Sequence, residues 1–382
     1  MIYFDNAATT FVKPRAVYYA VDNALRNFSA NPGRSGHLLA MEAASRVYDC
    51  RRKTARLFNC AKEENVTFTL NGTMSLNMAI KGVARKGDHF IISGLEHNAV
   101  ARPVEALKNR GNISYDIAKV FGDDESTVKS FERLIRKNTR AIVCTHVSNV
   151  FGTVLPIEKI GQLARDRGII FIVDAAQSAG ILPIDVKQMN MDFLCMPAHK
   201  GLFAPMGLGV LIACGDIPLE TLIEGGTGSA SSSLVQPEIL PDRLESGTVN
   251  LPAIAGLSAG IDFINSVGIK NILAHEKKIV HYLYDEFSHM EEVELYTPKP
   301  EYPFFAPLIS FNIKGVKSDA VAHLLDEDNI AVRAGLHCAP LAHNCYGTTA
   351  QGTVRLSPSV FNTIGQAKYI VRCVKKIKKY AI

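Results

Sequence analysis

Short runs of apolar residues alternate with amphipathic, helix-like stretches between about residues 40 and 210. The apolar runs cover residues 65–70, 89–93, 140–147, 169–177, 193–196 and 207–213. Continuous apolar runs separated by amphipathic helices are typical of a mostly parallel β-sheet that is covered by helices on both faces. Such sheets bind their ligands beyond the carboxyl ends of the strands. The pattern therefore predicts an α/β domain with a site at that edge of its sheet.

The pattern changes after about residue 255. Two long helical stretches, at about residues 252–267 and 270–289, lead into the apolar run 307–313 and the stretch 318–335, and a last helical stretch closes the chain. A chain of 382 residues is long for a single hydrophobic core. We therefore expect a second, smaller α+β domain.

The composition narrows the class of protein. With 47% hydrophobic and 21% charged residues, the chain resembles an ordinary soluble, globular protein. A net charge of +5 is too small to indicate nucleic-acid binding, and the basic run VKKIKKYAI (374–382) fits the solvated face of a last helix. No signal peptide is visible, and no apolar run approaches the ~18 residues that a membrane span needs. Eight cysteines without a CxxC pair suit reduced thiols in a cytoplasm.

Polar residues follow the first three predicted strands. Gly72 and Thr73 follow the first and open a helix, where free N–H groups and the helix dipole favour an anion such as phosphate, although a plain N-cap threonine is commoner. His97 follows the second and suits a cap, a core position or stacking on another ring. Asn149 follows the third and can donate to an oxygen or form an Asx-turn.

Charged residues end the next two strands. Asp174 ends an apolar run, and a buried carboxylate there needs a charged or protonated partner; Gln177 follows three residues later. Lys200 lies in a loop, because Gly201 and Pro205 follow it. A loop lysine is usually solvated, but an amine at the end of a buried strand can also form a Schiff base with a carbonyl cofactor.

Together these strand ends supply an anion seat, a ring-stacking histidine, an amide, a carboxylate and an amine. Pyridoxal phosphate (PLP) needs such a set, because it carries a phosphate, an aromatic ring, a pyridinium nitrogen and an aldehyde. Each signal is weak alone, but their order along one sheet makes PLP the predicted cofactor.

The chain carries these residues in motifs that resemble those of the class V aminotransferase superfamily of fold type I PLP enzymes. Within that superfamily it resembles the cysteine desulfurase/selenocysteine lyase branch. The motifs that carry the resemblance are FDNAATT (4–10), NGT (71–73), EHNA (96–99), THVSNVFGT (145–153), VDAAQSAG (173–180), AHKG (198–201), LESGTVN (244–250), VRAGLHCAP (332–340) and VRLSPSVFNT (354–363). The resemblance implies a mostly parallel sheet of the seven-stranded type in a large PLP-binding domain, residues 14–254. Residues 1–13 and 255–382 would form the small α+β domain.

The resemblance also implies roles around the ring of the cofactor. Lys200 would hold PLP as a Schiff base, and Asp174 would pair with the ring nitrogen. His97 would stack on the ring and move protons. Gln177 and Asn149 would lie near the phenolic oxygen and the substrate.

The phosphate and the substrate carboxylate have their own implied partners. The helix start at Gly72 and Thr73 would bind the phosphate together with His199. Thr248 would reach the phosphate of the neighbouring subunit, which implies an obligate homodimer. Arg355 would bind the substrate carboxylate, for which a planar guanidinium is suited.

Cys338 separates the desulfurase branch from its relatives. The resemblance implies that its thiolate attacks the substrate's sulfur, leaving a persulfide on the enzyme and alanine as product. The context RAGLHCA resembles the second group of desulfurases, whose cysteine loop is short. An alternative is a zinc site of His337, Cys338, His343 and Cys345, but their spacing is not that of a common finger or ribbon, so we expect no metal.

The predicted function is a cytoplasmic cysteine desulfurase that converts L-cysteine or L-selenocysteine to alanine and passes sulfur to an acceptor protein. Pro197 stands where many relatives have serine, and Ala204 stands where glycine is usual. The stretch GTTAQGTVRLSP (347–358) resembles a subgroup associated with selenium metabolism. The alternatives are a class V aminotransferase, epimerase or lyase for another amino acid, and a non-catalytic sulfur- or metal-handling protein on this fold.

Overall fold

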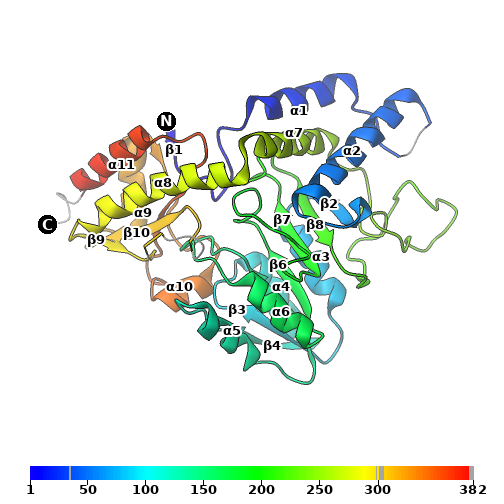
Figure 1. Cartoon of the computed structure of the whole chain (residues 1–382), viewed down its shortest axis with the longest axis horizontal. Coiled ribbons are helices and arrows are strands. Elements are labelled where there is room, and N and C mark those ends of the chain that lie inside the picture. Colours follow the sequence, from blue (N-terminus) through cyan, green and yellow to red (C-terminus); the bar gives the residue numbers. More distant parts are fainter. Residues whose placement is uncertain (34–35, 298, 301–304, 378–382) are drawn as a thin grey trace.

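The computed structural model describes residues 1–33, 36–297, 299–300 and 305–377. Its largest element is a seven-stranded sheet with the strand order β2-β8-β7-β6-β5-β3-β4 (Figure 1). The strands are β2 (Val66–Thr69), β3 (Asp88–Ser93), β4 (Ile113–Ala118), β5 (Thr139–Thr145), β6 (Ile170–Asp174), β7 (Phe193–Pro197) and β8 (Gly209–Ala213). All but β4 coincide with the apolar runs of the sequence, and the predicted α/β fold with a central sheet is confirmed.

The sheet is parallel except at β8, which runs antiparallel to both β2 and β7. The register pairs Thr145 at the end of β5 with Asp174 at the end of β6. Because the other strands point the same way, the residues that follow them meet at one edge. The missed strand, β4, lies at the end of the sheet and is only partly buried, with Ser114 and Ile117 exposed, so it lacks the continuous apolar run of the inner strands.

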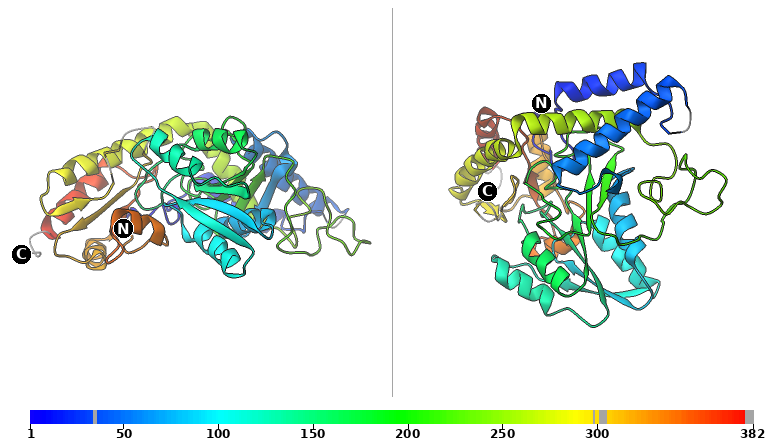
Figure 2. Two further views of the ribbon diagram at one scale, coloured as in Figure 1. Left: turned by 90° about the horizontal axis from the view of Figure 1, so that it is seen from below. Right: turned by 45° about the vertical axis from the view of Figure 1, so that its right-hand side comes forward.

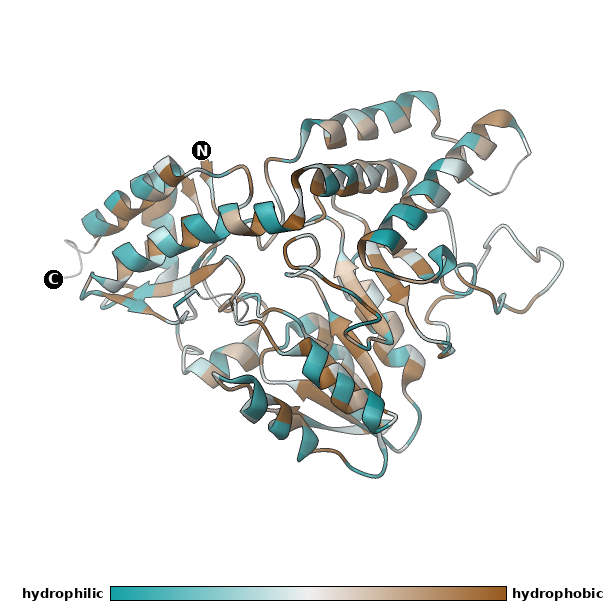
Figure 3. Cartoon of the chain, in the orientation of Figure 1, coloured by the Kyte–Doolittle hydropathy of each residue, from teal (hydrophilic) through white to brown (hydrophobic). Residues whose placement is uncertain are grey.

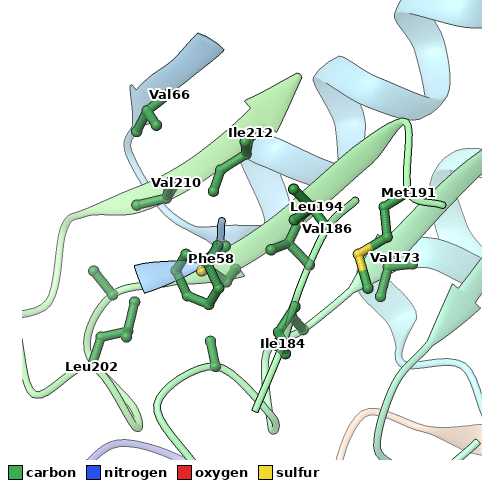
Figure 4. Close-up of a cluster of buried hydrophobic side chains, with 14 of the residues drawn as sticks. Phe58, Val66, Val173, Ile184, Val186, Met191, Leu194, Leu202, Val210 and Ile212 are labelled. Carbon is green, nitrogen blue, oxygen red and sulfur yellow. The ribbon is translucent and has the colours of Figure 1, made fainter. Parts of the chain in front are cut away.

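Helices cover both faces of the sheet. They are α1 (Arg15–Asn27), α2 (Leu38–Leu57), α3 (Gly72–Val83), α4 (Asn98–Asn109), α5 (Asp124–Glu132), α6 (Ile157–Asp166) and α7 (Leu251–Val267), with a 3-10 turn at Glu63–Asn65. Alternate residues of β7 enter two cores: Leu194 packs with residues of α2, α6 and α7, and Phe193 packs with residues of α3 and α4. Figure 4 shows the first core, with Val173, Leu194 and Ile212 of adjacent strands beside Phe58.

The remaining elements pack around a third core, except α10 (Pro340–Tyr346), which packs against the two cores of the large sheet. The others are β1 (Ile2–Tyr3), α8 (Ile269–Ser288), β9 (Val293–Leu295), β10 (Ile309–Ile313), α9 (Ser318–Glu327), β11 (Ile330–Ala331), β12 (Val354–Leu356) and α11 (Ile364–Ile377). Strands β12-β10-β9 form an antiparallel sheet, against which α8, α9 and α11 pack, and β1 pairs in parallel with β11. The N-terminal strand thus joins the C-terminal part of the chain, while the domain boundaries given above stay a prediction. Figure 3 shows hydrophobic strands beneath helices of mixed polarity.

Residues 214–250, between β8 and α7, form no helix or strand, and part of this segment extends away from the sheet (Figures 1 and 2). Among the described residues, no single helix has the length and apolarity to cross a membrane; α7 and α8 meet that test only as a pair bent by 80°, by length and composition alone. The described residues stop at Ile377 in α11, so residues 378–382 of the predicted basic run lie outside them.

Candidate active site

A cavity of about 220 Å³ lies at the carboxyl edge of the large sheet. All the predicted site residues line it except Cys338 and Thr248: Gly72, Thr73, His97, Asn149, Asp174, Gln177, His199, Lys200 and Arg355. Thr248 is exposed and does not line this cavity. Its hydroxyl lies 3.4 Å from the side-chain amide nitrogen of Asn31.

The N-terminus of α3 forms one wall of the cavity. Asn71 caps this helix, because its side-chain oxygen accepts a hydrogen bond from the Met74 N–H at 2.9 Å. The first-turn N–H groups of Gly72 and Thr73 have no partner within the helix, and both residues line the cavity. Gly72 has no room for a side chain, since a Cβ there would lie 2.9 Å from Cδ of Pro197. This helix start can seat an anion such as phosphate.

The N-terminal segment holds the loop that carries Lys200. The Thr10 hydroxyl lies 3.0 Å from the carbonyl oxygen of His199 and 3.1 Å from that of Lys200. Lys13 donates to the same His199 carbonyl at 3.3 Å, and His199 Nδ1 is paired with the Thr9 hydroxyl at 3.0 Å. Burial, with the charges of Lys200 and Lys13, lowers the pKa of His199 to about 4, so its ring is neutral at pH 7.

Asp174 and Lys200, an acid and a base, both line the cavity. Asp174 is 3% exposed, and its Oδ1 accepts from the Ala176 N–H at 2.8 Å. Burial raises the pKa of Asp174, against the opposing effects of that N–H and of the Lys200 charge. Burial also lowers the pKa of Lys200 to about 8, although Asp174 opposes the shift. A fraction of Lys200 is therefore a neutral, nucleophilic amine near pH 7.

His97 caps α4 with its side chain. Its Nδ1 accepts a hydrogen bond from the Ala99 N–H at 3.0 Å, so the proton of the neutral ring lies on Nε2. Burial, followed by the charge of Lys200, lowers the pKa of His97 to about 4. The ring is thus a neutral Nε2–H donor at the cavity.

Arg355 is 1% exposed and lies between two oxygen atoms. Its Nη2 donates to Oδ1 of Asp5 and its Nη1 donates to the Asn149 carbonyl, both at 2.7 Å. The Nε of Arg355 and the Oδ1 of Asn149 are buried and have no hydrogen-bond partner among the described residues. Sequence reasoning gave Asp5 no role, although a buried arginine requires a counter-charge.

Cys338 directly follows His337, which lines the cavity, and backbone hydrogen bonds hold this segment. Its carbonyl accepts from the Asn98 N–H at 2.7 Å, and the preceding carbonyl, of His337, accepts from Asn149 Nδ2 at 2.8 Å. The Cys338 thiol is exposed, and its backbone is left-handed with φ 57°. Arg333 lines the cavity and its Nη2 lies 3.8 Å from Sγ of Cys338, a relationship that sequence reasoning missed.

The side chains of the alternative zinc site have other partners. His337 Nε2 pairs with the Thr353 carbonyl at 2.9 Å, His343 Nδ1 pairs with the Thr348 hydroxyl at 2.7 Å, and the Cys345 thiol lies 3.4 Å from the Gly94 carbonyl. Across the described part of the chain, no group of three or more His, Cys, Asp or Glu side chains is arranged to hold a metal ion.

The residues present fit PLP. The α3 terminus can seat its phosphate, and Lys200 supplies an amine of lowered pKa. Asp174 is a buried carboxylate to which a pyridinium nitrogen would be a suitable partner. The unpartnered Nε of Arg355 and Oδ1 of Asn149 leave polar groups for a substrate at the same cavity.

Comparison with known proteins points the same way. Residues 2–370 match the family model described as aminotransferase class-V. The chain is 33% identical to a probable cysteine desulfurase of Methanothermobacter thermautotrophicus, over 98% of this chain and 94% of the relative. It is 32% identical to a probable cysteine desulfurase of Pyrococcus abyssi, over 99% of this chain and 94% of the relative.

Solved structures of cysteine desulfurases are also similar to this chain. An apo cysteine desulfurase from Thermococcus onnurineus NA1 has a TM-score of 0.92 at 32% identity, covering 99% of this chain and 94% of that one. A cysteine desulfurase of Escherichia coli, described as the S-sulfonic acid, has a TM-score of 0.89 at 26% identity, covering 100% of this chain and 95% of that one.

Proposed function

Because the chain belongs to the class V aminotransferase family, we propose that it is a PLP-dependent cysteine desulfurase that converts L-cysteine to L-alanine. The observation that carries this proposal is that an exposed thiol, Cys338, lies beside Arg333 and His337, which line the same cavity as Lys200 and Asp174. PLP, when bound, withdraws electrons from the amino acid and so weakens the bonds around its Cα and Cβ atoms. The protein's own residues then have to bind, orient and move protons.

The residues around the cavity divide this work. Lys200 would hold the cofactor through its amine, and the carboxylate of Asp174 would pair with the ring nitrogen. His97 would offer its Nε2–H to the ring, while Gln177 and Asn149 would offer amides to the phenolic oxygen and the substrate. The α3 terminus at Gly72 and Thr73, together with His199, would bind the phosphate. The neutrality of His97 and His199 leaves Lys200 and the arginines as the cations of the site.

Arg355 binds the substrate carboxylate. Its guanidinium is already oriented by Asp5 and by the Asn149 carbonyl, so little side-chain freedom is lost on binding. The unpartnered Nε gives the carboxylate a donor that these two contacts do not use.

Cys338 takes the sulfur. Its thiolate attacks the substrate's sulfur; the S–S bond forms, the C–S bond breaks, and the electron pair stays on carbon, which takes up a proton to become the methyl group of alanine. The guanidinium of Arg333, 3.8 Å from Sγ, offers a positive partner to the thiolate and to the persulfide anion. Selenocysteine is a second substrate on this proposal, since its C–Se bond is weaker.

We propose a homodimer in which Thr248 reaches the phosphate site of the partner, since it is exposed and outside its own cavity. The surface of α1 and α2 supports an interface, because large apolar side chains gather there: Tyr18, Tyr19, Leu25, Leu38, Leu39, Met41 and Tyr48. The exposed Cys338 would pass its sulfur to an acceptor protein. Eight free cysteines suit a reducing cytoplasm.

The experiment is cofactor trapping together with product analysis. The protein reconstituted with PLP should be yellow, should release alanine and sulfide from cysteine, and should carry the label on the peptide of Lys200 after borohydride reduction. Lys13 is the matched control, because burial lowers its pKa to about 8 as well, so Lys13→Arg should leave the label in place. A label elsewhere, or a colourless reconstituted protein, would contradict the proposal.

A further inference from the structure

Glu96 is a second buried acid at this end of the sheet, and the roles described above do not use it. It is 0% exposed and immediately precedes His97. Its Oε1 accepts hydrogen bonds from the Ser93 hydroxyl at the end of β3 and from the Thr145 N–H, at 2.7 Å, at the end of β5. The Glu96 side chain therefore joins two strand ends that carry the cavity wall.

The surroundings of Oε2, the second carboxyl oxygen of Glu96, bear on whether the side chain is ionised or neutral. Oε2 is buried and has no hydrogen-bond partner among the described residues. A carboxylate would leave a buried charge there unpaired, whereas a neutral acid carries its proton on Oε2 and leaves only an uncharged O–H without an acceptor. An unpaired buried charge costs more than an unpaired O–H, so the observed contacts, two donors to Oε1 and none to Oε2, favour the neutral form.

Neighbouring acids also favour the neutral form. Thr145, whose N–H binds Glu96, is paired in register with Asp174 on β6. Two carboxylates this near each other in an apolar wall do not both ionise readily. The groups that face Glu96 are Ser93 on β3, Cys144 and Thr145 on β5 and Asp174 on β6, and none of them is a cation.

We propose that Glu96 is a positioning residue that works as a protonated acid: it ties the ends of β3 and β5 together, holding His97 and Thr145 at the cavity, and leaves Asp174 as the carboxylate. The inference rests on the proposed function only in that His97 and Asp174 serve the cofactor. Burial, and after it the charge of Asp174, raises the pKa of Glu96 to about 8, although the hydrogen bonds from Ser93 and Thr145 oppose the shift. Cys144 is also kept neutral, because burial, and after it the charge of Asp174, raises the pKa of its thiol.

The first test needs neither cofactor nor substrate. Glu96→Gln keeps an oxygen acceptor and cannot ionise, so it mimics the protonated acid. The pKa of Glu96 is about 8 in the folded chain against an ordinary 4.5, so between these values the folded chain keeps a proton that the unfolded chain has lost. The wild-type folding constant should therefore fall by about tenfold per pH unit relative to Glu96→Gln between pH 5 and pH 8, and level off above pH 8.

Chemical denaturation of the cofactor-free proteins measures this difference, with the exposed Glu64→Gln as control. Parallel stability curves for wild type and Glu96→Gln from pH 5 to pH 8 would overturn the proposal, because Glu96 would then be ionised in the folded state. A wild type that fails to release alanine would instead refute the proposed function, and it would leave this readout unaffected.

The second test concerns positioning. Glu96→Ala should lower kcat by on the order of a hundredfold, because the displaced strand ends misplace His97 and Thr145. Glu96→Gln should rescue most of that loss, whereas Glu96→Asp, whose carboxyl is one methylene short of Thr145, should not. A Gln variant as slow as the Ala variant would contradict a role for the neutral acid. If Glu96→Ala does not fold, the comparison of Gln with Asp decides.

Discussion

The guanidinium of Arg355 lies 2.7 Å from the carboxylate of Asp5, and both belong to segments that are far apart in the chain. Asp5 follows β1 and Arg355 lies in β12, so this ion pair links the N-terminal segment to the predicted carboxylate-binding arginine. Asp5 keeps the buried guanidinium charged and in place before any substrate is present.

Removing this counter-charge should destabilise the protein. Asp5→Asn keeps an oxygen beside Arg355 but loses the charge, so the free energy of unfolding should fall by about 1.5–3 kcal/mol, the range for hydrogen bonds to charged groups. Asp22→Asn is the matched control, since Asp22 and Arg26 form an exposed pair, with side chains 59% and 73% exposed. Chemical denaturation at pH 7 should separate the two variants; equal losses would mean that the Asp5 pair contributes no more than a surface pair.

The contact between Gly72 and Pro197 determines the shape of the phosphate seat. Pro197 offers neither a hydroxyl nor an N–H, and a missing charge-assisted hydrogen bond costs about 1.5–3 kcal/mol if no other donor replaces it. Pro197→Ser should therefore slow the loss of PLP on dialysis. Gly72→Ala should speed it, because the new Cβ would lie 2.9 Å from the proline ring. Faster loss from Pro197→Ser would mean instead that the ring is needed to shape the loop.

Acid should destabilise the protein partly through His97. Its pKa is about 4 in the folded chain against an ordinary 6.5, so between these values the unfolded chain binds a proton that the folded chain does not. This contribution to stability is present above pH 6.5 and is lost as the pH falls towards 4. His97→Asn keeps a side-chain oxygen to cap α4 and removes the titration.

The measurement is the free energy of unfolding of both proteins at pH 7.5 and pH 5. Wild type should lose more stability than His97→Asn over this interval. His146 and His199, whose pKa values burial also lowers to about 4, are present in both proteins and cancel in the comparison. Equal losses would show that His97 does not titrate differently in the folded and unfolded chains.

Much of the fold could be predicted because the inner strands are buried on both faces. Such strands appear in the sequence as unbroken apolar runs. Parallel strands place their carboxyl ends at one edge of the sheet, where ligands bind, so His97, Asp174 and Lys200 could be predicted to line one cavity. The predicted superfamily is confirmed as well. The edge strand β4 was missed because half-exposed strands lack that signal.

Side-chain relationships across distant segments could not be predicted. Asp5 meets Arg355 across 350 residues of the chain, through the packing of the N-terminal segment on β12. Arg333 is only five residues from Cys338, but their contact depends on the left-handed backbone at His337 and Cys338, which the sequence does not show. Glu96 belongs to the EHNA motif, but its burial between two strand ends depends on how β3 and β5 pair, which the sequence does not show. The role of Thr248 depends on a second chain and stays a prediction.

The central claim is that Cys338 accepts the substrate's sulfur, and mass spectrometry of the protein after incubation with cysteine tests it most directly. Wild type and Cys345→Ala, the neighbouring exposed thiol whose side chain lies against Gly94, should both gain one sulfur atom on the peptide of Cys338. Cys338→Ala should stay yellow and still change its spectrum on binding cysteine, but it should gain no sulfur and release almost no sulfide. Desulfuration of cysteine by Cys338→Ala at the wild-type rate would contradict the account.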